Sequence, residues 1–380
     1  MQEAPLWLNL TIARFGPSIC VAIGSQCHTL ETIPAPCRAK EPSNVRAVIC
    51  MEPGRLEVIE RPMPAAGPGE VLVRIRRIGV CGTDMHIYQG DQPYLSYPRV
   101  MGHELAGEVA EAPRGSKLKA GDPVYVVPYI ACGSCIACRA GKTNCCMKLQ
   151  VLGVHRDGGM CEYLALPEAN VFPAGDIGLD AAAMVEFLAI GAHAVARSGV
   201  RAGQRALVVG AGPIGMGVIL FARLRGAIVT ALDGRAERLS VARDALGASS
   251  IVSLGPEDAA QLAAETNGEF YDAVFDATGN ANAMQRGLSF VAHGGALIYV
   301  SLVRQDIALP DPEFHKRETT LYASRNALPA DFETVLAAFR DGHVPIATLN
   351  THRARLEELP ERMPQWIAPV AGVVKAVLEV

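Results

Sequence analysis

The chain has 380 residues, of which 50% are hydrophobic and 19% charged, and this ordinary globular composition can build about two domains with buried cores. The formal net charge of −4 indicates no basic surface for nucleic acid, and no apolar run reaches the roughly 18 residues that a membrane helix needs. The first stretch, MQEAPLWLNLTIARFG, has Glu3 where a secretory signal would carry basic residues. We therefore expect a cytoplasmic protein whose thiols stay reduced.

Residues 1–44 form an N-terminal extension of uncertain order. They contain three cysteines without the spacing of a metal site, and the prolines at positions 34, 36 and 42 argue against regular elements. An ordered extension, a disordered tail and a true start downstream of Met1 are all compatible with this composition. We favour the second or the third interpretation.

Residues 45–187 are rich in Val, Gly and Pro, with short alternating stretches such as EVLVRIRRIGV at 70–80. Alternation interrupted by frequent turn residues is typical of strands. The sequence therefore predicts a β-rich domain in this region.

Two clusters of metal-binding residue types lie in the first half of this domain. GVCGTDMH at 79–86 offers Cys81, and RVMGHELAGEV at 99–109 offers His103 and Glu104. Thiolate and imidazole suit zinc, and Glu104 or a later acid could complete a site with fewer than four protein ligands, which leaves a position for water or substrate. Each residue alone could be a buried Cys or a core His; together they favour a catalytic metal site.

Five cysteines crowd into CGSCIACRAGKTNCC at 132–146. Four of them follow the spacing C-x2-C-x2-C-x7-C, which suits one tetrahedral zinc ion: Cys132, Cys135, Cys138 and Cys146. Cys145 is left over, because two adjacent cysteines rarely bind one ion. Four thiolates leave no open position, so this zinc would be structural. An iron–sulfur cluster or unrelated cysteines are the alternatives.

From about residue 188 to 323 the pattern changes to helices that alternate with short buried strands. The stretches occur in the order AHAVARSGV, RALVVG, PIGMGVILFARLRG, AIVTALD, YDAVFDATG and GALIYVS. This order predicts a doubly wound parallel sheet of the Rossmann type. Residues 324–380 return to a mixed α/β pattern.

A glycine-rich turn, VVGAGPIGMG, joins the first of these strands to its helix in the order G-x-G-x-x-G. Gly210 would allow the tight turn, Gly212 the approach of a dinucleotide pyrophosphate, and Gly215 the close packing of helix on strand. Pro213 and Ile214 begin the helix, whose N-terminus would face the phosphates.

Asp233 ends the next strand and would accept hydrogen bonds from the adenosine ribose hydroxyls. The negative charge of Asp233 would repel the 2′-phosphate of NADP, so the sequence favours NAD. Arg235 and Arg238, which are nearby, leave NADP as an alternative cofactor. Asp233 alone could also be a solvated acid at a strand end.

CGTDMH, GHE, the four-cysteine cage, VEFLAIGAHAV and VVGAGPIGMG, in this order, resemble the zinc-dependent medium-chain dehydrogenases, the alcohol and polyol dehydrogenase family. The resemblance covers roughly residues 45–380. It implies a GroES-like catalytic domain in two parts, 45–187 and 324–380, with an NAD-binding Rossmann domain at 188–323 inserted between them. It also implies two zinc ions per subunit, a small-molecule substrate and a homo-oligomer, either dimer or tetramer.

The resemblance assigns the catalytic zinc to Cys81 and His103. The third ligand varies within the family: alcohol dehydrogenases use a Cys where this chain has Glu186, and polyol members use the Glu after the His, here Glu104. We predict Glu104, with Glu186 near enough to bind directly or through water. Lys375 stands where a basic residue usually meets the cofactor pyrophosphate.

The resemblance also implies the chemistry. Zinc lowers the pKa of the substrate hydroxyl, and Thr83 would relay the proton through the cofactor ribose to His86, which can release it to solvent. Hydride would then move to C4 of the nicotinamide.

Three stretches, GDQPYLSYPRVMGHE, VLGVHRDGG and DPEFHKRETTLYASRNA, resemble bacterial sugar-acid dehydrogenases, which suggests L-galactonate, oxidised at C5. A substrate carboxylate needs a cation in a partly desolvated cleft, and the candidates are His155, Arg156 and Arg325. Each could instead be a surface charge or, as for Arg325, a cofactor contact. A general polyol dehydrogenase, a zinc-free quinone reductase and a non-enzymatic zinc-binding module are the alternative functions.

Overall fold

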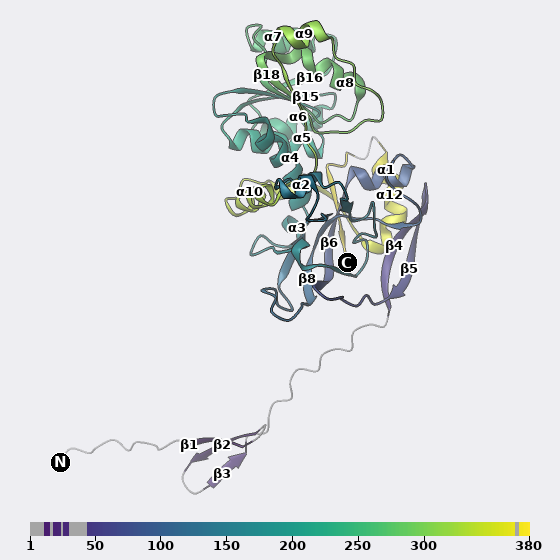
Figure 1. The fold of residues 1–380 in the computed structure, drawn as a ribbon, viewed down its shortest axis with the longest axis vertical. Coiled ribbons are helices and arrows are strands. Elements are labelled where there is room, and N and C mark those ends of the chain that lie inside the picture. Colours follow the sequence, from purple (N-terminus) through teal and green to yellow (C-terminus); the bar gives the residue numbers. More distant parts are fainter. Residues whose placement is uncertain (1–10, 16–17, 24–25, 30–43, 369–371) are drawn as a thin grey trace, which may run out of the picture. The chain divides into compact units, whose positions relative to one another are not determined.

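The computed structural model describes residues 11–15, 18–23, 26–29, 44–368 and 372–380 (Figure 1). Within the N-terminal unit, residues 1–43, strands β1 (Thr11–Phe15), β2 (Ser18–Ile23) and β3 (Gln26–Thr29) form an antiparallel sheet. The expectation that the extension lacks regular elements is therefore wrong for these strands, because their β-branched residues favour extended pairing. The three prolines that argued against regular structure lie outside the described residues.

The catalytic domain is built on a seven-stranded sheet around β6 (Glu70–Val80). Three strands pair antiparallel with β6: β8 (Glu104–Glu111), β12 (Tyr163–Pro167) and β21 (Lys375–Glu379). The sheet is completed by β9 (Pro123–Val126), β13 (Val171–Pro173) and β20 (Asn350–Arg355). The C-terminal strands, yellow in Figure 1, thus join a sheet whose other strands precede the parallel-sheet domain in the sequence.

Smaller elements surround this sheet. A second sheet contains β5 (Arg55–Pro62), β4 (Asn44–Glu52) and β7 (Arg99–Val100), and a ribbon pairs β10 (Tyr129–Ile130) with β11 (Gln150–Val151). The short helices are α1 (Gly82–Gln89), α2 (Ile136–Arg139), α3 (Leu179–Ala182), α11 (Ile346–Leu349) and α12 (Leu359–Ile367). The predicted β-rich, GroES-like architecture agrees with this arrangement.

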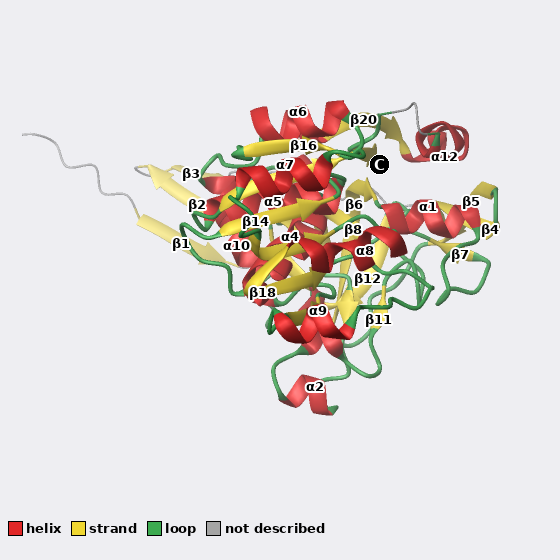
Figure 2. Cartoon of the chain, turned by 90° about the horizontal axis from the view of Figure 1, so that it is seen from above, coloured by secondary structure: helices red, strands yellow, loops and turns green. Residues whose placement is uncertain are grey.

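The second domain is a six-stranded parallel sheet in the order β16-β15-β14-β17-β18-β19, which is the 3-2-1-4-5-6 order of a doubly wound fold. Its strands are β14 (Arg205–Val209), β15 (Ile228–Asp233), β16 (Ser250–Ser253), β17 (Tyr271–Asp276), β18 (Val291–Tyr299) and β19 (Thr320–Ala323). Its helices, red in Figure 2, are α5 (Pro213–Leu224), α6 (Ala236–Asp244), α7 (Asp258–Glu265), α8 (Ala281–Arg286) and α9 (Asp311–Lys316). Helix α4 (Val185–Ser198) precedes the first strand of this sheet, and α10 (Pro329–Arg340) follows the last.

Helix α4 links the two domains. In its middle, Gly191 packs directly on the backbone of α5, because a Cβ at this position would lie 2.5 Å from the carbonyl carbon of Gly217. Its first turn carries the buried Glu186. The contact with α5 thus fixes the position from which Glu186 extends. Among the described residues, no helix combines the length and the apolar character needed to cross a membrane.

Candidate active site

Cys81, His103 and Glu104 converge at one end of β6. One ligand atom from each lies within 4.8 Å of the other two. Cys81 precedes α1, and Glu104 begins β8, where it pairs with Gly79 of β6. A Cβ at Gly79 would lie 2.0 Å from Oε2 of Glu104, so the glycine makes room for the carboxylate. Separate strand ends thus bring together a thiol, an imidazole and a carboxylate, a donor set that suits zinc.

Asp84 lies next to these ligands on the side away from the cluster, and the sequence analysis did not identify it. The side chain is fully buried; its Oδ2 accepts the Cys81 N–H at 2.9 Å and its Oδ1 accepts the Gly102 N–H at 3.2 Å. Oδ1 also lies 3.8 Å from Nδ1 of His103, which has no hydrogen-bond partner. A carboxylate behind a ligating histidine fixes the ring orientation. The sequence feature that could have identified Asp84 is its place as the third residue of the helix that begins at Gly82, where an acidic side chain often accepts the N–H of the residue before the helix.

Glu186 adds a second acid to the cluster. Its Oε1 accepts a hydrogen bond from the Tyr129 hydroxyl, while its buried Oε2 has no partner. Burial raises the pKa of Glu186 to about 6, which the nearby His103 opposes. A buried carboxylate oxygen without a donor is costly unless a cation binds there. The unpaired Oε2 of Glu186 therefore fits a metal ion in this cluster.

Lys375 forms a buried ion pair with Glu104. Its Nζ lies 2.6 and 2.7 Å from the two carboxylate oxygens, donates to the Val80 carbonyl at 3.3 Å, and sits 4.4 Å from the centre of the Phe187 ring. Burial opposes the charge, but Glu104 raises the pKa of Lys375. The three acceptors occupy its three N–H donors. The predicted contact with a cofactor pyrophosphate would require the ammonium to leave Glu104.

Thr83 and His86 lie three residues apart on α1, so they share one helix face. Thr83 is half-buried and His86 is exposed to solvent. The half-buried Thr83 and the exposed His86 are thus arranged as the predicted proton relay requires, although the relay itself stays a prediction.

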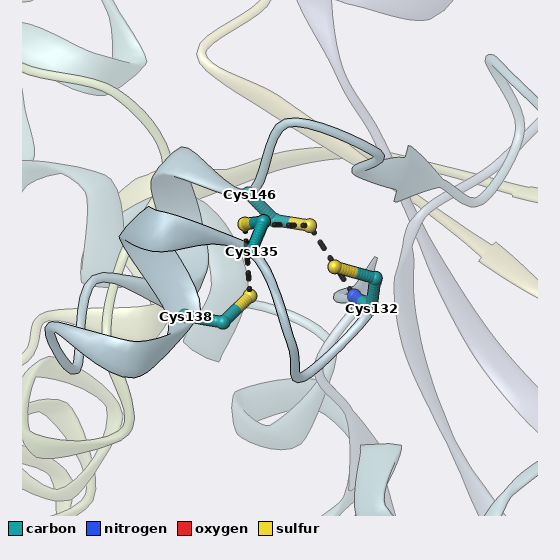
Figure 3. Close-up of side chains that lie close together, drawn as sticks. All are labelled: Cys132, Cys135, Cys138 and Cys146. Carbon is teal, nitrogen blue, oxygen red and sulfur yellow. Dashed lines mark hydrogen bonds between the residues drawn. The ribbon is translucent and has the colours of Figure 1, made fainter.

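The four cage cysteines point toward one another (Figure 3). The Sγ atom of Cys135 lies 3.5 Å from that of Cys138 and 3.9 Å from that of Cys146. A zinc tetrahedron with Zn–S bonds of about 2.3 Å has edges of about 3.8 Å. Hydrogen bonds from backbone amides lower the pKa of Cys132 to about 6, which favours thiolate. The cage residues therefore fit zinc, while Cys145 is exposed and lies outside the group.

A buried polar network connects the cage loop to α4 and α10. Nδ2 of Asn144, in the cage loop, lies 3.1 Å from Nε2 of His193 on α4. Nδ1 of the same histidine lies 2.7 Å from Oδ2 of Asp331 on α10. Asn144 also donates to the carbonyl of Arg325 at 2.8 Å. The cage loop thus fixes the backbone at which the chain returns from the parallel sheet.

The glycine turn leaves β14 at its carboxyl end, as predicted. Gly210 has φ of 91°, and a Cβ at Gly215 would lie 1.8 Å from the Gly210 oxygen, so neither position accepts a side chain without strain. A Cβ at Gly212 would meet only Nη1 of Arg238, at 3.7 Å. Gly212 therefore leaves open space at the N-terminus of α5, as a bound pyrophosphate requires.

Residues 67–176 match the alcohol dehydrogenase GroES-like domain family and residues 213–341 the zinc-binding dehydrogenase family. The chain is 40% identical to L-galactonate-5-dehydrogenase of Escherichia coli K12 over 337 residues, 88% of this chain and 99% of the relative. The chain belongs to the zinc-dependent medium-chain alcohol dehydrogenase family. The predicted family, fold class and enzyme class, a dehydrogenase of CH–OH groups, are thereby confirmed.

Two further relatives support this membership. D-altritol 5-dehydrogenase of Agrobacterium fabrum is 34% identical over 324 residues, which cover 83% of this chain and 94% of the relative. The crystal structure of the Escherichia coli CFT073 alcohol dehydrogenase RspB with NADH superposes with a TM-score of 0.84 at 26% identity, covering 89% of this chain and all of that one.

In this dehydrogenase, Asp233 lies at the end of β15 beside the glycine turn. Its Oδ2 accepts the Ala211 N–H at 2.7 Å and its Oδ1 accepts the Arg235 N–H at 2.8 Å. Nη1 of Arg238 lies 3.9 Å from Oδ2. The carboxylate thus holds the turn itself, and each of its oxygens keeps a lone pair for a further donor.

The three candidate cations for a substrate carboxylate separate in the structure. His155 and Arg325 are exposed; burial lowers the pKa of His155, and the charges of Arg325 and Arg99 lower it further. Arg156 is half-buried on the same loop as His155, and its carbonyl accepts the Gly153 N–H at 2.8 Å.

Proposed function

We propose that the chain is an NAD-dependent, two-zinc dehydrogenase that oxidises the C5 hydroxyl of L-galactonate or of a related sugar acid. The observation that carries the proposal is the cluster of Cys81, His103 and Glu104, together with the unpaired buried Oε2 of Glu186, in a chain that also has a doubly wound parallel sheet. The substrate class is supported by 40% identity to L-galactonate-5-dehydrogenase across nearly the whole of that protein.

Residues of the chain have distinct tasks in this reaction. Zinc bound by Cys81 and His103, with Glu104 or Glu186, supplies a Lewis acid that lowers the pKa of the substrate hydroxyl. Asp84 fixes the His103 ring, and Tyr129 holds one oxygen of Glu186 while the other stays available. Thr83 accepts the hydroxyl proton and passes it toward exposed His86, which releases it to water. The glycine turn positions the cofactor for hydride transfer.

A general polyol dehydrogenase is the second candidate, supported by 34% identity to D-altritol 5-dehydrogenase. The zinc-loaded protein should be assayed for NADH formation with L-galactonate, D-altritol, galactitol and simple alcohols. We expect the highest kcat/KM with L-galactonate, because the chain is 40% identical to L-galactonate-5-dehydrogenase. Equal or faster turnover of the neutral polyols would contradict the sugar-acid assignment and favour the second candidate.

Asp233→Ser is expected to shift the cofactor preference toward NADP. The charged hydrogen bonds to the ribose and the repulsion of a 2′-phosphate are both lost, so kcat/KM for NAD should fall about 10- to 100-fold. The measurement is the ratio of kcat/KM values for NAD and NADP, with Asp233→Asn as control, which removes the charge but retains one acceptor for the turn. A wild-type protein that already prefers NADP would show that Arg235 or Arg238 selects the cofactor instead.

We further propose a homo-oligomer in the cytoplasm. The oligomer, dimer or tetramer, is supported by the resemblance of the chain to the family, and the location by a four-thiol cage that requires reduced cysteines.

A further inference from the structure

We infer that Tyr129 is a positioning residue that limits Glu186 to one oxygen for the catalytic metal, and so keeps a coordination position free for the substrate hydroxyl. The inference rests on the proposed function and deepens it, because it names the group that keeps the metal site open. A zinc ion with three protein ligands has a fourth position for substrate, and a carboxylate that bound the ion through both oxygens would compete for that position.

The Tyr129 hydroxyl and the Glu186 carboxylate meet in the interior of the protein. The hydroxyl donates a hydrogen bond to Oε1 of Glu186, and the buried Oε2 has no hydrogen-bond partner among the described residues. The two residues are 8% and 4% exposed, so water has little access to either oxygen. One carboxylate oxygen is therefore satisfied by the protein, and the other is available to a cation.

Two contacts place the start of α4 against Glu104. A Cβ at Gly79 would lie 2.0 Å from Oε2 of Glu104 and 3.1 Å from the backbone oxygen of Ala183, so both oxygens approach the same point of β6. The Phe187 ring centre lies 4.4 Å from Nζ of Lys375, which binds Oε1 of Glu104 at 2.6 Å. The acid between Ala183 and Phe187 is therefore carried by a segment that packs on this metal ligand from both sides.

Tyr129 is held in place by its backbone and by its ring. It pairs with Val151 in the β10–β11 ribbon, and its carbonyl accepts a hydrogen bond from Nδ2 of Asn170 at 3.2 Å. The ring packs edge-on against Phe332, with centroids 6.4 Å apart. A hydroxyl held in this way donates its single proton in a fixed direction, which sets the rotation of the carboxylate that accepts it.

Helix α4 fixes the backbone of Glu186. Gly191 packs directly on the backbone of Gly217 in α5, and further along the helix Nδ1 of His193 lies 2.7 Å from Oδ2 of Asp331. Because the backbones on both sides of the hydrogen bond are held, the carboxylate can change its contacts only by rotation of its own side chain. The bond to the tyrosine hydroxyl opposes this rotation.

Loss of the Tyr129 hydroxyl would leave Oε1 of Glu186 buried and without a donor. Such an oxygen costs free energy, and in the zinc-loaded protein the ion is a partner that can replace the lost donor. With both oxygens on the ion, the substrate hydroxyl must displace one of them. The metal should thus bind at least as tightly as in the wild type, while the alcohol binds less tightly.

Tyr129→Phe removes the hydroxyl and keeps the ring against Phe332. We expect KM for L-galactonate to rise about 10- to 100-fold, the range that corresponds to one hydrogen bond with a charged group. KM for NAD should stay unchanged, and kcat should change less than KM for the alcohol. A fall in kcat alone, with both KM values of the wild type, would overturn the inference.

Metal binding is measured without any substrate. Dialysis against a chelator should remove the catalytic zinc first, because the cage has four thiolates and no open position. Co²⁺ is then titrated into the protein that retains one zinc ion per subunit. The visible absorption of Co²⁺ weakens as its coordination number rises above four, so Tyr129→Phe should give weaker bands per bound ion, with a Kd equal to or lower than that of the wild type. Weaker Co²⁺ binding with wild-type bands would overturn the inference.

Tyr125→Phe is the matched control. Tyr125 is also a buried tyrosine, 2% exposed, and it stacks on the same Phe332 ring with centroids 6.0 Å apart. The hydroxyl that donates to Glu186 is nevertheless that of Tyr129. Tyr125→Phe should therefore keep the wild-type bands, Kd and KM, and an effect as large as that of Tyr129→Phe would overturn the inference.

Glu186→Gln tests whether Tyr129 acts through this acid. An amide side chain has a single oxygen, so Tyr129→Phe should change the Co²⁺ bands and KM little when it is combined with Glu186→Gln. An equal effect of Tyr129→Phe in both backgrounds would show that the hydroxyl acts elsewhere, and would overturn the inference.

The metal titration and the kinetic assay separate this inference from the proposed function. Co²⁺ bands that weaken in Tyr129→Phe, in a protein that oxidises no alcohol, would support the role of Tyr129 and reject the dehydrogenase reaction. Turnover with NAD, together with wild-type bands and wild-type KM in Tyr129→Phe, would reject the role of Tyr129 and keep the dehydrogenase.

Discussion

Cys135→Ser should release one zinc ion per subunit and lower the melting temperature by roughly 10 °C or more, because structural zinc binding is coupled to folding. The cage loop carries Asn144, which contacts His193 of α4 and the carbonyl of Arg325, and His193 in turn contacts Asp331 of α10. Loss of the cage should therefore loosen all three. Cys81→Ser should also release one zinc ion but keep the fold, while kcat falls about a thousandfold or more with the Lewis acid.

The measurements are zinc content by elemental analysis, melting temperature and kcat on the same preparations. Cys145→Ser is the matched control, because this exposed cysteine adjoins Cys146 but lies outside the group of four. It should retain two zinc ions, the wild-type melting temperature and full activity. A fully active wild-type protein with a single zinc ion per subunit would contradict the two-site interpretation.

The sequence predicted those parts of the site that depend on local spacing. The cage cysteines lie within fifteen residues, and the glycine turn within ten, so their geometry follows from one loop and one strand-to-helix connection. Cys81 and His103 come from separate segments; their residue types suggested a shared metal site, and the resemblance to the family assigned the catalytic zinc to them. The domain boundaries at 44/45, 187/188 and 323/324 remain predictions.

Other features depend on tertiary contacts that no local pattern encodes. Asp84 acts through backbone amides of two segments, Tyr129 reaches Glu186 from a short ribbon, and Lys375 meets Glu104 only because β21 pairs with β6. The strands within residues 11–29 were missed because prolines further along the chain were given too much weight. For Tyr129 and Lys375 the decisive partner lies far away in sequence.

Lys375→Met should lower the free energy of unfolding of the metal-free protein by about 3–5 kcal/mol, the typical cost of leaving one partner of a buried ion pair alone. The Lys375 and Glu104 side chains are 2% and 0% exposed, so water cannot replace the lost ammonium. Urea unfolding gives the free energies. Glu104→Gln should cost a similar amount by stranding Lys375, and the double variant should cost much less than the sum of the two, as expected for residues in direct contact.

Zinc extends the same argument to the catalytic centre. Each Glu104 oxygen accepts one hydrogen bond from Lys375, which leaves a lone pair on each for a cation. In Lys375→Met a bound zinc ion becomes the only positive charge beside the Glu104 carboxylate, so zinc should stabilise this variant more than it stabilises the wild type. Two results together would contradict this argument: zinc stabilises both proteins equally, and the free-energy losses of the two single variants add up in the double variant. Glu104 would then interact neither with zinc nor with Lys375 as its burial requires.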